Sequence, residues 1–303
     1  MKREEENLVN AAPRWLGDRQ IGALGFGCWR LVGNDTQAAT RLISSALELG
    51  MTLIDNADVY GLDWGGTAFG ESERLLGSVL AQNPTLRDKM VLASKGSILP
   101  GVPYVANAAY LNAACDASLH RLQSEHIDLY QIHRPDMFTH PEETAAALDG
   151  LVAAGKISMV GVSNYAQAQI HALRSFLQAP LVSLQSQFSV SKLDLLRDGS
   201  LDLCMETGMT PLAWSPLAGG QIVSGEHQPA ALISVLDGLA ARENVDRAAI
   251  ALGFILAHPA ACLPLIGSQS SERLNAATAA LSVCLTRRDV YQIIEASEGI
   301  PLP

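Results

Sequence analysis

Short apolar segments alternate with longer amphipathic segments along almost the whole chain. The short segments have the length of buried strands, whereas the longer ones repeat apolar residues every three or four positions, as helices do. We place strands at residues 24–27, 52–55, 91–94, 127–132, 159–163, 182–185, 210–214 and 263–266. Strands that alternate with helices predict parallel βα units, and eight such units predict a closed (β/α)8 barrel of the α/β class.

The helix boundaries carry recognisable signals. The predicted helices before Gly50 and Gly155 each end at a glycine, which favours a left-handed stop. Thr286, with Asp289 three residues later, predicts the start of the last helix. Two helices, at 230–243 and 246–258, are predicted between strands seven and eight, so we expect extra helices near the C-terminus.

Residues 14–21 contain Gly17 and Asp18 between apolar neighbours, and we expect a hairpin that caps the bottom of the barrel. No composition shift, repeat or linker interrupts the βα pattern. We therefore assign residues 1–303 to a single domain and expect about residues 1–12 to be disordered.

Composition narrows the functional class. The formal net charge is -10, which argues against nonspecific binding to nucleic acid or to an anionic membrane. No long apolar run or signal-peptide core is present, so we expect a cytoplasmic protein with no membrane partner. The five cysteines form no CxxC pair and no HExxH motif occurs, so we predict reduced thiols and no metal site. We also predict no obligate protein partner.

Chemically useful side chains gather at three successive predicted strand ends. Asp55, Lys95 and His133 follow strands two, three and four, and Tyr60 lies in the loop after strand two. Neighbouring strands lie about 4.8 Å apart, and barrel catalysis occurs at this end of the strands. A phenol with a pKa of about 10 is a weak acid unless a cation assists it. Each residue alone has an ordinary structural explanation, but together they suit proton delivery to a carbonyl.

Six motifs follow one another in a familiar order: IDNADVYG, ASKG, IHRP, GVSN, AWSPLAGG and IGSQSSER. From about residue 24 to the last helix, the chain resembles the aldo-keto reductases, in particular bacterial members with short substrate loops. The resemblance implies reduction of aldehydes or ketones to alcohols, with hydride from nicotinamide C4. It implies that Tyr60 is the general acid, that Lys95 and Asp55 lower its pKa as an ion pair, and that His133 orients the carbonyl.

The resemblance also implies a cofactor site without a Rossmann motif, and indeed no GxGxxG occurs. The implied contacts are Gly27, Cys28, Trp29, Asp55, Ser163, Asn164, Gln187, Trp214, Ser215, Leu217, Gln221, Ile266, Gly267, Ser268 and Arg273. Arg273 matches the position that binds the adenosine 2'-phosphate, so NADP(H) is the preferred cofactor. Because Gly267 and Ala277 replace the more frequent Lys and Asn, use of NAD(H) stays open.

For the small-molecule carbonyl substrate we predict a pocket formed by Tyr60, His133, Trp29 and Trp64. Two other functions remain open. The chain could be a cofactor-binding regulatory or redox-sensing subunit with little turnover. It could also be a lysine-dependent barrel aldolase, in which Lys95 forms a Schiff base. The sequence leaves undecided the physiological substrate, the direction of the reaction and the oligomeric state.

Overall fold

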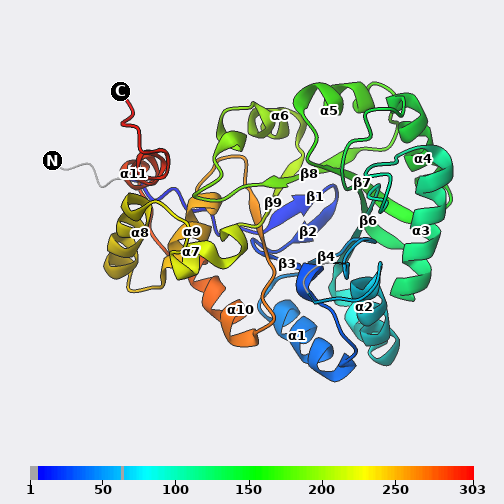
Figure 1. The fold of residues 1–303 in the computed structure, drawn as a ribbon, viewed down its shortest axis with the longest axis horizontal. Coiled ribbons are helices and arrows are strands. Elements are labelled where there is room, and N and C mark those ends of the chain that lie inside the picture. Colours follow the sequence, from blue (N-terminus) through cyan, green and yellow to red (C-terminus); the bar gives the residue numbers. More distant parts are fainter. Residues whose placement is uncertain (1–5, 63–64) are drawn as a thin grey trace.

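Eight parallel strands close into a barrel in the computed structural model, which describes residues 6–62 and 65–303 (Figure 1). The ring runs β10-β3-β4-β5-β6-β7-β8-β9, so neighbours in sequence are neighbours in space. The strands are β3 (Gly25–Gly27), β4 (Leu53–Asp55), β5 (Val91–Gly96), β6 (Ile127–Ile132), β7 (Ile157–Ser163), β8 (Leu181–Gln187), β9 (Thr210–Trp214) and β10 (Leu263–Ile266). The predicted barrel is confirmed, with strand ends within two residues of those expected.

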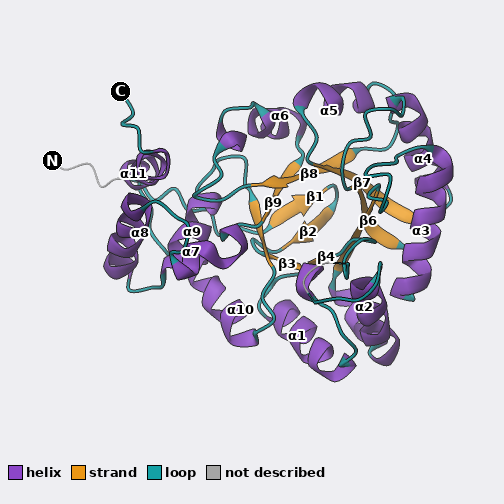
Figure 2. Cartoon of the chain, viewed as in Figure 1, coloured by secondary structure: helices purple, strands orange, loops and turns teal. Residues whose placement is uncertain are grey.

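Helices surround the strands on the outside of the ring (Figure 2). They are α1 (Thr36–Glu48), α2 (Glu71–Gln82), α3 (Ala108–Leu122), α4 (Pro141–Ala153), α5 (Gln167–Arg174), α6 (Ser200–Thr207), α7 (Gln221–Ser224), α8 (Ala230–Glu243), α9 (Arg247–Leu256), α10 (Ser271–Ala277) and α11 (Arg287–Glu298). Gly50 and Gly155 follow α1 and α4 with φ values of +80° and +70°, as their stop signals predict. At α11 the backbone N–H of Thr286 donates to Asp289, and that of Asp289 donates to the Thr286 hydroxyl.

The N-terminal hairpin closes one end of the barrel. Its strands β1 (Arg14–Leu16) and β2 (Arg19–Ile21) pair antiparallel, and the Thr210 hydroxyl at the start of β9 donates to the Trp15 carbonyl. Leu16 and Ile21 are buried in a cluster with inward-facing residues of the barrel strands. This apolar layer fills the lower barrel, which leaves the carboxyl ends of the strands for polar side chains.

The segment between β9 and β10 supplies α7, α8 and α9, which is more than one crossover helix requires. Together with α11 these helices enclose a separate apolar cluster on one side of the barrel. Residues 7–10, within the stretch expected to be disordered, are held here by hydrogen bonds. Leu8 N–H donates to the Leu285 carbonyl over 2.8 Å and Asn10 N–H to the Leu256 carbonyl over 3.2 Å. Val9 is partly buried against both apolar clusters, which explains why this part of the terminus is fixed.

Candidate active site

The loop after β4 is held against β5 by backbone hydrogen bonds. Asn56 N–H donates to the Ala93 carbonyl over 2.9 Å, and Asp58 N–H donates to the Lys95 carbonyl over 3.0 Å. Tyr60 N–H then returns to the Ala57 carbonyl over 3.2 Å, forming a tight turn. The turn brings the phenol back over the strand end instead of letting it extend into solvent.

Lys95 is the centre of the site. Its ammonium nitrogen donates to Asp55 Oδ2 over 2.7 Å, to the Asn56 carbonyl over 2.9 Å and to the Tyr60 hydroxyl over 3.0 Å. Lys95 is 0% exposed and Asp55 is 2% exposed. An ammonium group has three N–H donors, so all three are satisfied here. The structure therefore brings together Asp55, Lys95 and Tyr60 as the sequence predicted.

Two buried glutamines, which the sequence analysis missed, complete the surroundings of Asp55. Gln131 and Gln185 each donate an amide N–H to Asp55 Oδ1, over 3.1 and 3.0 Å. Gly161 lies beside them, and a Cβ there would come within 2.9 Å of the Gln131 side chain and 2.3 Å of Ser183 Oγ. The missing side chain makes room for this amide layer. The alternation of side chains along β6 could have identified Gln131, because it places Gln131 on the same inward face as His133.

His133 stands directly after β6, and its N–H donates to the Gly96 carbonyl over 2.8 Å. Its ring meets the Tyr60 ring edge-on, with centroids 5.8 Å apart. Asn164 donates to the His133 carbonyl over 3.2 Å and accepts from the indole N–H of Trp214 over 3.0 Å. Asn164 thus connects the predicted catalytic histidine to Trp214, one of the implied cofactor contacts.

Burial controls the protonation of the site. It lowers the pKa of His133 well below its ordinary value, and the positive charges of Lys95 and Arg134 act in the same direction. Burial also lowers the pKa of Lys95, but attraction to Asp55 and Tyr60 is stronger in sum, so the net direction is upward. Lys95 therefore stays protonated, which disfavours the aldolase alternative because a Schiff base forms from a neutral amine.

The pKa of Tyr60 moves opposite to the sequence-based expectation. Burial raises it, Lys95 lowers it and Asp55 raises it again, and the net direction is upward. Lys95 lowers the pKa through both its charge and its hydrogen bond, whereas Asp55 and Cys28 raise it, and burial has the largest effect. Tyr60 consequently holds its proton at neutral pH.

A groove of about 500 Å³ contains several of the predicted cofactor contacts. Its lining includes Trp29, Gln187, Trp214, Ser215 and Gln221. The Arg30 guanidinium donates to the Gly219 carbonyl over 3.0 Å and so connects the loop after β3 with the loop after β9. An aromatic platform at the catalytic end and polar side chains along the groove fit a nicotinamide dinucleotide.

The other predicted cofactor residues lie in different surroundings. Cys28 and Ile266 are buried core residues, of which Cys28 exposes no surface, and Leu217 is partly buried against the core. Ser268 accepts from the N–H of Ser270, the N-cap of α10, and Arg273 projects from the first turn of that helix as an exposed side chain. Arg273 forms no ion pair with any residue from 6 to 62 or 65 to 303, so its guanidinium is available to an anion.

Trp64, predicted to line the substrate pocket, lies outside the described residues. Trp29, its predicted partner, is partly exposed and lines the groove. Among the described residues, no group of three or more His, Cys, Asp or Glu side chains is arranged to hold a metal ion. Within the same residues, no helix is long and apolar enough to cross a membrane.

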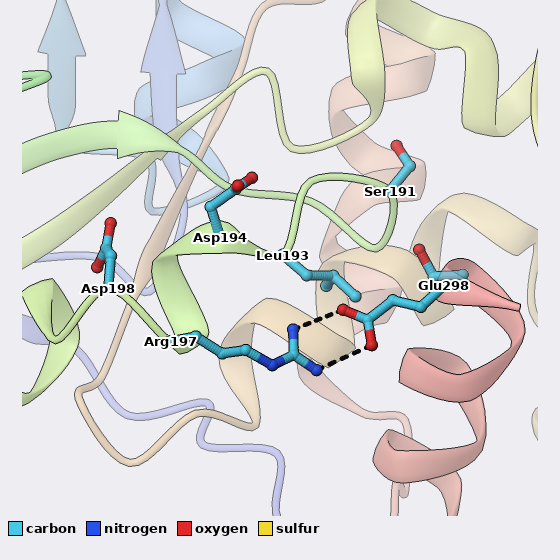
Figure 3. Close-up of a pocket in the computed structure, with 7 residues that line it drawn as sticks. Ser191, Leu193, Asp194, Arg197, Asp198 and Glu298 are labelled. Carbon is cyan, nitrogen blue, oxygen red and sulfur yellow. Dashed lines mark hydrogen bonds and ion pairs between the residues drawn. The ribbon is translucent and has the colours of Figure 1, made fainter. Parts of the chain in front are cut away.

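A second hollow, of about 420 Å³, lies between the loop after β8 and α11 (Figure 3). Arg197 spans it and forms two hydrogen bonds with Glu298, of 2.5 and 2.9 Å. Asp194 and Asp198 also line it, but none of the predicted cofactor contacts does. Its cation, Arg197, is already paired with Glu298, so we favour the groove and not this hollow as the cofactor site.

Comparison with known proteins agrees with this geometry. The family model described as "Aldo/keto reductase family" matches residues 23–298. A 6-dehydroglucose reductase of Novosphingobium aromaticivorans is 43% identical over 286 residues, covering 93% of this chain and 94% of that protein. Another, of Agrobacterium fabrum, is 33% identical over 298 residues, covering 94% of this chain and 97% of that protein. A solved aldo/keto reductase of Klebsiella pneumoniae, in complex with NADP and acetate, has a TM-score of 0.80 at 25% identity and covers 97% of this chain and 98% of that one. The chain belongs to the aldo/keto reductase family.

Proposed function

We propose that the protein reduces aldehydes or ketones to alcohols with NADPH. The observation that carries the proposal is the buried Lys95 ammonium, which binds Asp55 and Tyr60 at once and lies beside His133. When bound, the cofactor supplies the hydride that adds to the carbonyl carbon. The protein's own residues then have to supply a proton and hold the oxygen while charge develops on it.

Tyr60 is the proton donor. Its raised pKa keeps the phenol protonated until the carbonyl oxygen becomes an alkoxide, which is a much stronger base. Lys95 donates to the phenol oxygen and so stabilises the phenolate left after transfer. His133 is neutral because of its burial, and an imidazole N–H can donate to the carbonyl oxygen beside Tyr60. Two donors on one oxygen favour the alkoxide over the carbonyl.

The cofactor preference rests on Arg273. A guanidinium that forms no ion pair with the described residues can form a bidentate contact with a 2'-phosphate, which NADH lacks. The NADP complex of the Klebsiella pneumoniae neighbour supports the same choice. Two relatives are named 6-dehydroglucose reductases, so an aldehyde carried on a sugar is the first natural substrate to test.

The test is the loss of NADPH absorbance with a panel of aldehydes, run in parallel with NADH. Tyr60→Phe should lower kcat at least about 10³-fold and leave the Kd for NADPH within twofold, because only the proton donor is lost. Tyr104→Phe is the matched control, since Tyr104 is a partly exposed phenol on the neighbouring loop. Full activity of Tyr60→Phe would overturn the mechanism, and tight NADPH binding without turnover would favour the regulatory subunit.

A further inference from the structure

Arg134, the residue after His133, carries a charge that the proposed reaction does not use. Its backbone is fixed, because its N–H donates to Ser97 Oγ over 2.9 Å and its carbonyl accepts from the same hydroxyl over 2.8 Å. Ser97 is fully buried directly after β5. The Arg134 side chain therefore starts from a rigid point at the carboxyl end of the barrel.

The guanidinium reaches across the mouth of the barrel. Its Cζ atom lies 5.9 Å from the centroid of the Trp214 ring. Arg134 follows β6, whereas Trp214 ends β9, and β7 and β8 stand between them in the ring. A side chain that contacts a ring three strands away has to lie over the opening, above the catalytic residues, and not against the outer helices.

The charge of Arg134 has no acidic partner in the part of the chain that the structure describes. Asp136, the nearest acid in sequence, accepts from Ala106 N–H, Phe138 N–H and the Thr139 hydroxyl, and so braces the loop instead. A guanidinium has five N–H donors and no acceptor. The Arg134 side chain is only partly buried, and its guanidinium lies near the Trp214 ring, so its donors can reach a ligand at the barrel mouth.

We propose that Arg134 forms a substrate subsite for an oxygen-bearing group, a hydroxyl or a carboxylate, on the carbon chain next to the reacting carbonyl. The inference rests on the proposed function, because Tyr60 and His133 fix where the carbonyl oxygen lies. The guanidinium then selects polyhydroxylated or acidic aldehydes over plain alkyl aldehydes. A hydrogen bond to a charged donor is lost outright when the substrate lacks the oxygen.

The experiment compares kcat/KM for two pairs of aldehydes with NADPH. Glyceraldehyde and propanal differ in hydroxyl groups, and succinic semialdehyde and butanal differ in a carboxylate. The variants are Arg134→Met, which keeps an apolar chain against Trp214, and Arg134→Lys, which keeps the charge but loses the planar fork. Arg134→Met should lower kcat/KM at least about tenfold for one or both oxygenated aldehydes and by less than about twofold for propanal and butanal.

Each outcome has a defined meaning. A loss confined to glyceraldehyde identifies hydroxyls as the ligand, and a loss confined to succinic semialdehyde identifies a carboxylate, which Arg134→Lys should partly retain. Equal losses for all four aldehydes would show that Arg134 acts only on the fold. No loss at all would show that Arg134 does not contribute to kcat/KM. Either result would overturn the subsite. If the wild-type protein reduces none of the four, the proposed function fails, and the substrate role of Arg134 fails with it.

Discussion

The protein contains two ion pairs with similar short distances and very different solvent exposure. Lys95 and Asp55 are 2.7 Å apart inside the barrel mouth, with side chains 0% and 3% exposed. Arg197 and Glu298 are 2.5 Å apart over the hollow beside α11, with side chains 51% and 28% exposed. Water competes with the second pair and not with the first, so equal geometry does not mean equal energy.

The difference shows what each pair can do. In the buried pair, each charge depends on the other, because neither has water to replace its partner. That dependence fixes the position of an ammonium beside Tyr60, which is useful for proton transfer. The surface pair joins the loop after β8 to the end of α11, but either side chain can be solvated when the other is lost.

Removal of Lys95 should have the largest effect. Lys95→Met leaves Asp55 as a buried charge without a cation, so we expect a loss of about 3–5 kcal/mol in the free energy of unfolding, measured with urea. It also removes the donor to Tyr60, so kcat should fall on the order of 10³-fold or more.

The matched control is the double variant Asp55→Asn with Lys95→Met. It removes both charges, so it should regain most of the lost stability while remaining inactive. Recovery of activity in the double variant would show that Lys95 serves the fold and not the proton transfer. A single variant as stable as the wild type would contradict the role of the buried charge.

The fold could be predicted because its pattern is periodic. All eight barrel strands and the hairpin at 14–21 follow from apolar segments, turn residues and glycine stops, which act locally. Residues 7–10 were harder to predict, since their order depends on Leu285 and Leu256, carbonyl partners far away in the sequence. Contacts of that kind leave no local signal.

The site could be predicted only in part, for the same reason. Asp55, Tyr60, Lys95 and His133 are visible as polar residues at strand ends, and the structure brings them together. Gln185 is different, because its link to Asp55 spans 130 residues of sequence. The rise in the pKa of Tyr60 could not be predicted either, since it depends on burial, which residue types alone do not give.

His133, a partly buried imidazole near two positive charges, sharpens the comparison. Burial, Lys95 and Arg134 hold the pKa of His133 well below 6.5, whereas in the unfolded chain it is about 6.5. Below pH 6.5, His133 therefore binds a proton in the unfolded chain but not in the folded protein. Its contribution to the free energy of unfolding is fully present above this pH and is lost as the pH falls towards the folded pKa. On going from pH 7.5 to pH 5.5, His133 should lower the free energy of unfolding by roughly 1 kcal/mol.

The measurement is urea unfolding of the wild type and of His133→Asn at those two pH values. Acidic groups elsewhere titrate in both proteins, so their contributions cancel in the difference. On going to the lower pH, the free energy of unfolding of the wild type should fall by roughly 1 kcal/mol more than that of the variant. Equal losses would mean that His133 accepts a proton in the folded protein as easily as in water.

The surface pair should give the smallest effect. Glu298→Gln removes the anion opposite Arg197, and exposed pairs contribute about 0.2–1 kcal/mol. Glu298 is also the last residue of α11, where a negative charge opposes the helix dipole, so its removal returns part of that energy. We expect a change within about 0.5 kcal/mol in urea unfolding, which disappears in about 1 M salt, and an unchanged kcat. A loss of several kcal/mol that persists in salt would show that exposure does not separate the two pairs and that α11 depends on Arg197 for its position.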